Sequence, residues 1–229
     1  MNSSTNATYY GLSTSKTDTD PHLMKNSEWG AVAYLEYSQY GRNGVQPNFN
    51  SFWYAYGTGN YAYTGYASSA TTGAQQTTTT VANISADNKY NGQYGILGST
   101  TGNVTGVYDM SGGLNEYTAA YASGASTSTG LTMITSGNSC TKYVTFYENK
   151  TLYSSTTVGD ALTETDTWDN NGDVKLSSSN LFIMRGGATS NGSGTLVAGV
   201  FSSYAANGGS TAESSNGRFR GFRPVLVTK

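Results

Sequence analysis

Asn26-Ser-Glu-Trp-Gly-Ala-Val-Ala-Tyr34 is the first of four short blocks whose order decides the fold expected for this chain. The second block is Val107-Tyr-Asp-Met-Ser-Gly-Gly-Leu-Asn-Glu-Tyr117. The third is Arg185-Gly-Gly187 and the fourth is Gly221-Phe-Arg-Pro-Val225. Glycines suit tight turns and aromatic side chains suit a core, so the blocks predict the frame of a fold rather than isolated motifs.

The first block predicts a helix over about residues 27–39. Asn26 or Ser27 can cap it, Glu28 places a negative charge in its first turn, and Gly41 can end it. Apolar and aromatic residues at helical spacing predict the buried stripe of this helix. They are Trp29, Val32, Ala33 and Tyr37.

The rest of the chain predicts short strands and long loops. Residues 142–147, 181–184 and 222–227 have the composition of strands, and Pro224 places the last of these at a sheet edge or a strand start. Residues 1–24 are expected to form an N-terminal arm, and residues 44–82 a long surface loop. The predicted class is α+β, with one or two helices, in a single domain spanning residues 1–229.

The second, third and fourth blocks contain four charged side chains, in a chain with only 11% charged residues. They are Asp109, Glu116, Arg185 and Arg223. Because a buried charge needs a partner of opposite sign, we expect carboxylates of the second block to pair with arginines of the third and fourth blocks.

The blocks together resemble the formylglycine-generating-enzyme (sulfatase-modifying factor) branch of the C-type lectin fold. The residues that match the family's runs lie in all four blocks. They are Glu28, Trp29, Ala33, Tyr108, Asp109, Met110, Gly112, Glu116, Arg185, Gly186, Gly187, Gly221, Phe222 and Arg223. The chain departs from the family in the second block, where Gly113, Asn115 and Tyr117 replace the usual Asn, Trp and Trp.

The resemblance implies either catalysis or ligand display, and the residue inventory argues against catalysis. Formylglycine-generating enzymes use a pair of cysteines with copper, and the related sulfoxide synthases use several histidines on iron. This chain has one cysteine, Cys140, and one histidine, His22. We therefore expect no enzyme activity and no cofactor, with Cys140 a small hydrophobe or a loop thiol and His22 a solvated loop residue.

Calcium is the one metal that the sequence leaves open. Asp169, Asn171 and Asp173 offer oxygens at alternating positions, as calcium loops do. Val174 and Asn180 stand where an EF-hand needs Gly and Glu. A polar turn is the favoured interpretation, because Asn, Asp and Gly dominate turns.

Composition restricts the partners and the location. Lys and Arg total 12 against 14 Asp and Glu, so no basic excess exists to bind the phosphates of a nucleic acid. No apolar run approaches the roughly 18 residues of a membrane span, so we expect no membrane insertion. The low charge and the many Ser, Thr and Asn residues are typical of an extracellular protein or one on a cell or virion surface.

Residues 188–220 lie between the third and fourth blocks and are the candidate ligand-binding loops. Their position and composition resemble the variable proteins of diversity-generating retroelements, which are lectin-fold receptors diversified in this region. The candidate contact residues are polar or aromatic, as in adaptable recognition surfaces. They are Asn191, Ser193, Ser202, Tyr204, Asn207, Ser210, Glu213, Asn216 and Arg218.

The sequence therefore predicts a non-catalytic receptor or adhesion protein of phage or bacterial origin, displayed on a surface. Its expected ligand is a protein or glycan on another cell or host. Two alternatives stay open, namely a diverged oxidase of the formylglycine-generating type and a structural component of a pilus or tail.

Overall fold

The computed structural model describes residues 19–50, 61–62, 91–93, 95–122, 142–147, 161–162, 165, 182–187, 199–206 and 220–228. In these ranges the chain mixes one α-helix and one 3-10 turn with short strands. The helix is α2 (Asn26–Tyr37), the 3-10 turn is η2 (Ile96–Gly98), and the strands are β1 (Thr19–Leu23), β2 (Phe49–Asn50), β3 (Tyr61–Ala62), β4 (Asn115–Thr118), β5 (Ala120–Ala122), β6 (Thr145–Tyr147), β7 (Phe182–Arg185), β8 (Ser203–Ala206), β9 (Arg220–Phe222) and β10 (Pro224–Thr228). This mixture agrees with the α+β class, while the lectin-type architecture stays a prediction.

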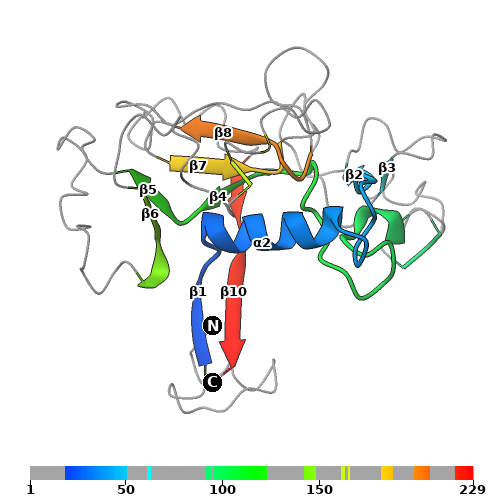
Figure 1. Ribbon diagram of the computed structural model, residues 1–229, viewed down its shortest axis with the longest axis horizontal. Coiled ribbons are helices and arrows are strands. Elements are labelled where there is room, and N and C mark those ends of the chain that lie inside the picture. Colours follow the sequence, from blue (N-terminus) through cyan, green and yellow to red (C-terminus); the bar gives the residue numbers. More distant parts are fainter. Residues whose placement is uncertain are drawn as a thin grey trace, which may run out of the picture.

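The largest sheet has four strands in the order β8-β7-β4-β9. Strands β4, β7 and β8 pair antiparallel, whereas β9 runs parallel to β4. Helix α2 crosses beneath this sheet in the view of Figure 1. Strands β7 and β9 flank β4, so Arg185 at the end of β7 and Arg220 at the start of β9 lie on the two strands on either side of β4.

Strands β1 and β10 form a separate antiparallel ribbon, which we call the stem. It pairs Thr19 with Thr228 at one end and Leu23 with Pro224 at the other. The stem extends away from α2 on the side opposite the four-stranded sheet (Figure 1). The single strand expected over residues 222–227 is wrong in detail, because the chain leaves the four-stranded sheet at Arg223 and enters the stem as β10. Pro224 begins β10, as predicted.

The predicted helix is confirmed, and α2 runs over Asn26–Tyr37. Trp29 and Ala33 of the expected stripe are fully buried, while Val32 and Tyr37 are partly buried and pack against the same core. Gly41 follows the helix, where its Cα lies so close to the Leu35 and Glu36 backbone that a Cβ would clash. This close approach is a reason for glycine at that turn.

The start of α2 differs from the expected capping. Lys25 is the N-cap residue, and the Glu28 carboxylate accepts a hydrogen bond from the Lys25 amide at 2.9 Å. Asn26 lies inside the helix with its side chain fully buried, where its amide donates to the Tyr147 hydroxyl at 2.8 Å. The sequence alone gave no reason to bury Asn26, because its partner lies 121 residues away.

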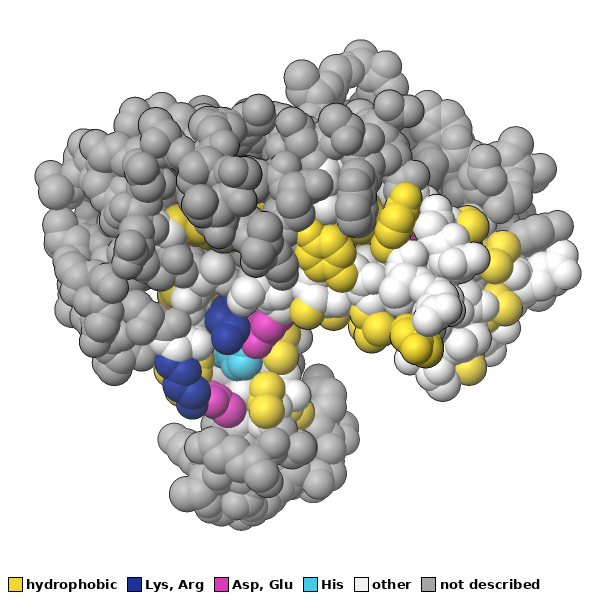
Figure 2. All heavy atoms as spheres, viewed as in Figure 1, with side chains coloured by type: hydrophobic (Ala, Val, Ile, Leu, Met, Phe, Trp, Pro, Cys, Tyr) yellow, Lys and Arg dark blue, Asp and Glu magenta, His cyan; other side chains and the backbone are white. Residues whose placement is uncertain are grey.

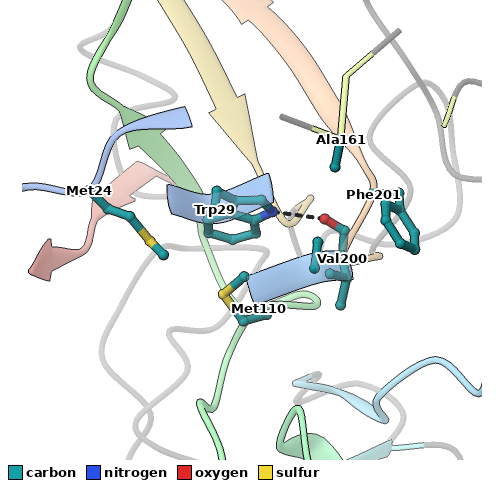
Figure 3. Close-up of a cluster of buried hydrophobic side chains, with 7 residues drawn as sticks. Met24, Trp29, Met110, Ala161, Val200 and Phe201 are labelled. Atoms are coloured by element: carbon teal, nitrogen blue, oxygen red, sulfur yellow. Dashed lines mark hydrogen bonds between the residues drawn. The ribbon is translucent and has the colours of Figure 1, made fainter. Parts of the chain in front are cut away.

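A compact hydrophobic cluster surrounds the indole of Trp29 (Figure 3). Its fully or nearly fully buried members come from five separate segments, and they are Met24, Trp29, Ala33, Met110, Ala161, Val200 and Phe201. The indole N–H donates to the Val200 carbonyl at 2.8 Å, so the only polar atom of this ring is satisfied inside the core. The cluster therefore joins α2 to the turns that precede β4 and β8.

Gly186 packs directly against Trp29 and has a φ of +83°, which L side chains rarely adopt. A Cβ there would lie 3.2 Å from Trp29 Cη2 and 3.3 Å from the Met110 carbonyl. We expect Gly186→Ala to lower the free energy of unfolding by about 3 kcal/mol, because it adds overpacking to the cost of left-handed backbone. Urea unfolding measures this value.

Gly44→Ala is the matched control, because Gly44 has a similar φ of +80° but its Cβ would meet only the Tyr37 ring at 3.7 Å. Gly44→Ala should lower the free energy of unfolding by about 1 kcal/mol, which is the cost of the left-handed backbone alone. Equal losses for the two variants would contradict the tight packing of Gly186 on Trp29.

Candidate functional site

Two guanidinium groups lie over the ring of Trp29, one from each side of the strand β4. The central carbon of Arg185, at the end of β7, is 6.0 Å from the ring centroid, and that of Arg223, between β9 and β10, is also 6.0 Å away. A guanidinium at this distance is attracted to the negative face of an indole. Trp29 of the first block thus contacts arginines of the third and fourth blocks.

Arg223 also forms a bidentate ion pair with Glu116 of β4. Its Nε donates to Glu116 Oε2 at 2.9 Å and its Nη2 donates to Oε1 at 2.7 Å. The predicted pairing of the second and fourth blocks is therefore confirmed. Burial raises the pKa of Glu116, and the Arg223 charge and hydrogen bonds offset only part of that rise.

Arg185 is fully buried, and its Nη2 donates to the Ala161 carbonyl at 2.6 Å. Its backbone stands opposite Glu116 in the β4–β7 register. Asp109 precedes the core residue Met110 in a left-handed turn with a φ of 62°. Its charge acts on Glu116 and contributes to the raised pKa of that carboxyl.

Backbone hydrogen bonds fasten the third block to the turn before β4 and to the turn before β8. The Gly186 carbonyl accepts from the Gly112 amide at 2.8 Å and from the Gly199 amide at 3.2 Å, and the Gly186 amide donates to the Ser202 carbonyl at 3.3 Å. Gly112 and Gly186 both have a positive φ, which lets the two turns approach. The start of the candidate ligand-binding region is thereby held against the frame.

The structure describes two of the nine candidate ligand-binding residues. Ser202 is 4% exposed, and Tyr204 lies in β8 opposite Met184 of β7. The remaining seven lie outside the described residues, and they are Asn191, Ser193, Asn207, Ser210, Glu213, Asn216 and Arg218. Ser202 belongs to the turn before β8, where its amide donates to the Gly199 carbonyl and its carbonyl accepts from the Gly186 amide of the third block. The other assignments stay predictions.

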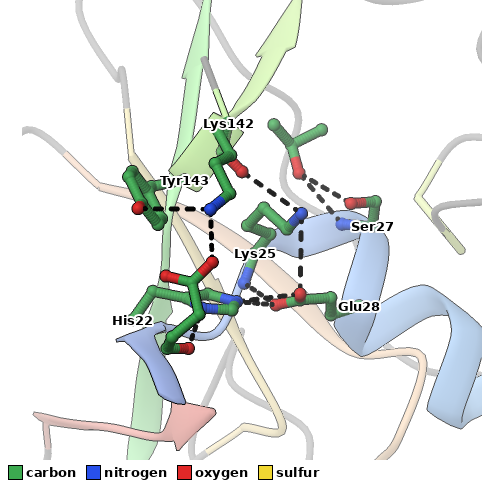
Figure 4. Close-up of polar contacts among 8 residues, drawn as sticks. His22, Lys25, Ser27, Glu28, Lys142 and Tyr143 are labelled. Atoms are coloured by element: carbon green, nitrogen blue, oxygen red, sulfur yellow. Dashed lines mark hydrogen bonds and ion pairs between the residues drawn. The ribbon is translucent and has the colours of Figure 1, made fainter. Parts of the chain in front are cut away.

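A second group of polar residues lies where the stem meets α2, and we call it the junction cluster. It consists of Asp20, His22, Lys25, Glu28, Lys142 and Tyr143. Figure 2 shows its charged side chains gathered at this junction, and Figure 4 shows how they point toward one another. The cluster joins β1, the first turn of α2 and the turn before β6.

His22 is the centre of the junction cluster, and its expected place in a solvated loop is wrong. It lies in β1 with a side chain that is 9% exposed. Its Nε2 is 2.9 Å and 3.1 Å from the two carboxylate oxygens of Glu28, and its Nδ1 is 3.1 Å from the Asp20 carbonyl. Both ring nitrogens are therefore occupied by oxygens of the chain, an arrangement that fastens the stem to the helix.

Glu28 holds several contacts at once. Burial alone would raise its pKa, but the hydrogen bonds from the Lys25 amide and the His22 ring, with the charge of Lys25, outweigh burial and lower the pKa. Lys142 pairs with Asp20 on the outer side of the cluster, and its ammonium lies 4.9 Å from the centroid of the Tyr143 ring. Sequence reasoning missed the cluster because Lys142 and Asp20 are 122 residues apart.

In the described part of the chain, no group of three or more His, Cys, Asp or Glu side chains lies close enough together to hold a metal ion. Cys140 and the calcium candidates Asp169, Asn171 and Asp173 lie outside the described residues. Within the same described part, no helix has the length and apolar character that crossing a membrane requires.

Comparison with protein-family models, with curated proteins and with solved structures finds no match. The resemblance carried by the four blocks therefore stays a prediction.

The Glu116–Arg223 pair gives a direct test of the contacts between the blocks. We expect Glu116→Ala to lower the free energy of unfolding by about 2 kcal/mol, because it leaves a guanidinium that is 22% exposed without its carboxylate. A double-mutant cycle with Arg223→Ala should give a coupling of about 1–3 kcal/mol. The control cycle is Asp20 with Lys142, whose coupling should be smaller because Lys142 is 59% exposed. Equal couplings would contradict the assigned role of the buried pair.

Acid unfolding distinguishes the two glutamates, because their pKa values are shifted in opposite directions. The lowered pKa of Glu28 contributes stability that is present above its unfolded value of about 4.3 and lost as the pH falls through its folded value. Glu28→Gln should therefore lose less stability than the wild type between about pH 5 and pH 3. The raised pKa of Glu116 acts in the opposite sense and at higher pH. The wild type gains stability from this group as the pH falls through its folded pKa toward its unfolded value of about 4.3, so Glu116→Gln should lose more stability over that range.

Urea unfolding over a pH series measures both slopes. If both variants differed from the wild type in the same direction in their loss of unfolding free energy on acidification, the pKa values of the two carboxyls would not be shifted in opposite directions.

Proposed function

We propose that this chain is a non-catalytic ligand-binding protein that is extracellular or displayed on a cell or virion surface, with residues 188–220 as its recognition segment. The observation that carries the proposal is the position of this segment on the sheet. It leaves from the end of β7 and returns at the start of β9, and both strands border β4. Recognition loops are commonly held in this way, with both ends on a rigid scaffold.

The contacts of the four blocks support a scaffold role for them. Trp29, Glu116, Arg185 and Arg223 are engaged with one another or with core carbonyls. These residues are also among those that carry the resemblance to the formylglycine-generating branch of the lectin fold. What differs between proteins built on such a frame is the set of loops it holds.

The runner-up is a diverged oxidase of the same branch. It would need soft thiolate ligands for copper or several imidazoles for iron, as the resemblance implies. The chain contains one Cys and one His, and both ring nitrogens of that His are engaged by Glu28 and Asp20. This inventory favours binding over oxidation. A structural pilus or tail component remains the third class.

Binding to arrayed glycans and to intact bacterial or host cells tests the proposal. Wild-type protein is expected to bind one class of these targets, and Tyr204→Ala and Asn207→Ala are each expected to weaken that binding at least about tenfold, as loss of an anchor does at an interface. Tyr40→Ala is the matched control, because Tyr40 is 79% exposed on the turn after α2 and belongs to no candidate site.

Melting temperatures of all variants separate lost recognition from lost folding. A ligand whose binding is unaffected by substitutions throughout residues 188–220, or is weakened equally by Tyr40→Ala, would contradict the proposed recognition segment.

A further inference from the structure

One backbone hydrogen bond next to the stem shows which of its residues direct their backbone groups inward. The Met24 amide donates to the Arg223 carbonyl at 2.9 Å, one residue beyond the paired Leu23 and Pro224. Opposite residues in an antiparallel ladder alternate between bonded and non-bonded pairs. Hence Arg223, Val225 and Val227 direct their backbone groups toward β1.

The same alternation directs the other residues of the stem outward. On β10 the outward groups belong to Pro224, Leu226 and Thr228, and on β1 to Thr19, Pro21 and Leu23. Both prolines fall in the outward set, as expected because a proline has no N–H to donate to the ladder. Among the described residues, no strand pairs with the outer edge of either β1 or β10.

The edge of β1 is protected against further pairing. Pro21 stands at its centre and offers no N–H there, and Asp20 and His22 beside it are engaged in the junction cluster. Proline and charged residues are common devices by which proteins block an exposed strand edge. A second strand laid along β1 would lose the central hydrogen bonds.

The edge of β10 has no such protection at its centre. Strand β10 reads Pro-Val-Leu-Val-Thr and has no charged residue. Leu226 is 37% exposed and Val227 is 45% exposed, although they point to opposite faces of the ribbon. A two-stranded ribbon is marginally stable alone, and further strands are the usual source of its stability.

We propose that the outer edge of β10 pairs with β10 of a second copy of this chain, in an antiparallel arrangement about a two-fold axis at Leu226. Each Leu226 amide then donates to the partner copy's Leu226 carbonyl, and each Thr228 amide donates to the Pro224 carbonyl of the other copy. Pro224 has no N–H to donate to the Thr228 carbonyl of the other copy. This missing hydrogen bond falls at each end of the pairing, where water can bond to the Thr228 carbonyl instead. The edge is thus self-complementary, as an isologous contact requires.

Strand β10 of a second copy fits this edge better than strand β1 of a second copy does. Pairing of β10 with the outer edge of a second copy's β1 would be head-to-tail, and Pro21 at the centre of that edge has no N–H to donate. The two-fold arrangement joins the stems of two copies into four strands in the order β1-β10-β10-β1 and closes after two chains. Two five-residue strands bury less than the roughly 1,200 Å² of a stable interface, so the dimer is weak in solution.

Such an association becomes important when the protein is crowded. Copies fixed on one surface reach local concentrations on the order of 1 mM, which drives contacts that are weak in dilute solution. The dimer would then present two copies of the four-stranded sheet at opposite ends of the joined stems.

Sedimentation equilibrium over a protein concentration range up to about 1 mM tests the proposal, since a small strand interface is expected to associate near that concentration. Wild-type protein should shift from 24.1 kDa toward twice that mass as its concentration rises. Leu226→Pro should remain monomeric, because it removes an outward N–H and no hydrogen bond of the stem. Leu226→Val keeps that N–H and should still dimerise.

A second variant, Leu226→Lys, guards against a folding defect of Leu226→Pro, because it leaves the backbone intact and places a charge on the edge. Circular dichroism confirms that each variant is folded. A wild-type protein that stays monomeric at about 1 mM, a larger assembly in place of a dimer, or dimers that persist in folded Leu226→Pro and Leu226→Lys would each overturn the proposal.

Discussion

The interaction on which the structure depends is the contact between the indole of Trp29 and the guanidinium groups of Arg185 and Arg223. These three side chains come from α2, the end of β7 and the junction of β9 with β10. Glu116 on β4 neutralises Arg223, and the Val200 carbonyl accepts the indole N–H. One aromatic ring thus fixes the helix, the four-stranded sheet and the first residue before the stem strand β10.

This constraint has a consequence for the last strand. Arg223 stands between β9 and β10, so its side chain is held by Glu116 at the point where the backbone changes sheet. The junction cluster repeats the arrangement on β1, where His22 is held by Glu28 of the helix. The stem is therefore fastened to the body by the Glu116–Arg223 ion pair at the residue before β10, and by the contacts of His22 with Glu28 and of Asp20 with Lys142 on β1. The segment between β7 and β9 is fastened through the backbone of Gly186.

The sequence was most informative where neighbouring residues determine the outcome. Helical spacing and the glycine after it placed α2 nearly correctly. Beyond neighbouring residues, the scarcity of charge predicted that carboxylates of the second block pair with arginines of the third and fourth blocks, and Glu116 with Arg223 is one such pair. His22 was placed wrongly, because its partner belongs to the helix and no local pattern distinguishes a buried imidazole from a solvated one. Asn26 or Ser27 was expected to cap α2, but Lys25 is the N-cap residue, and Asn26 is buried in contact with Tyr147. The loop residues proposed for recognition have no periodicity that would predict their arrangement.

The most direct test of the central contact is hydrogen exchange of the Trp29 indole N–H, followed by nuclear magnetic resonance and assigned through its disappearance in Trp29→Phe. The ring is 0% exposed and its N–H is bonded to Val200, so exchange should require global unfolding. Its free energy of exchange should match that of urea unfolding. Exchange as fast as that of a free indole would show that Trp29 does not hold the four blocks together.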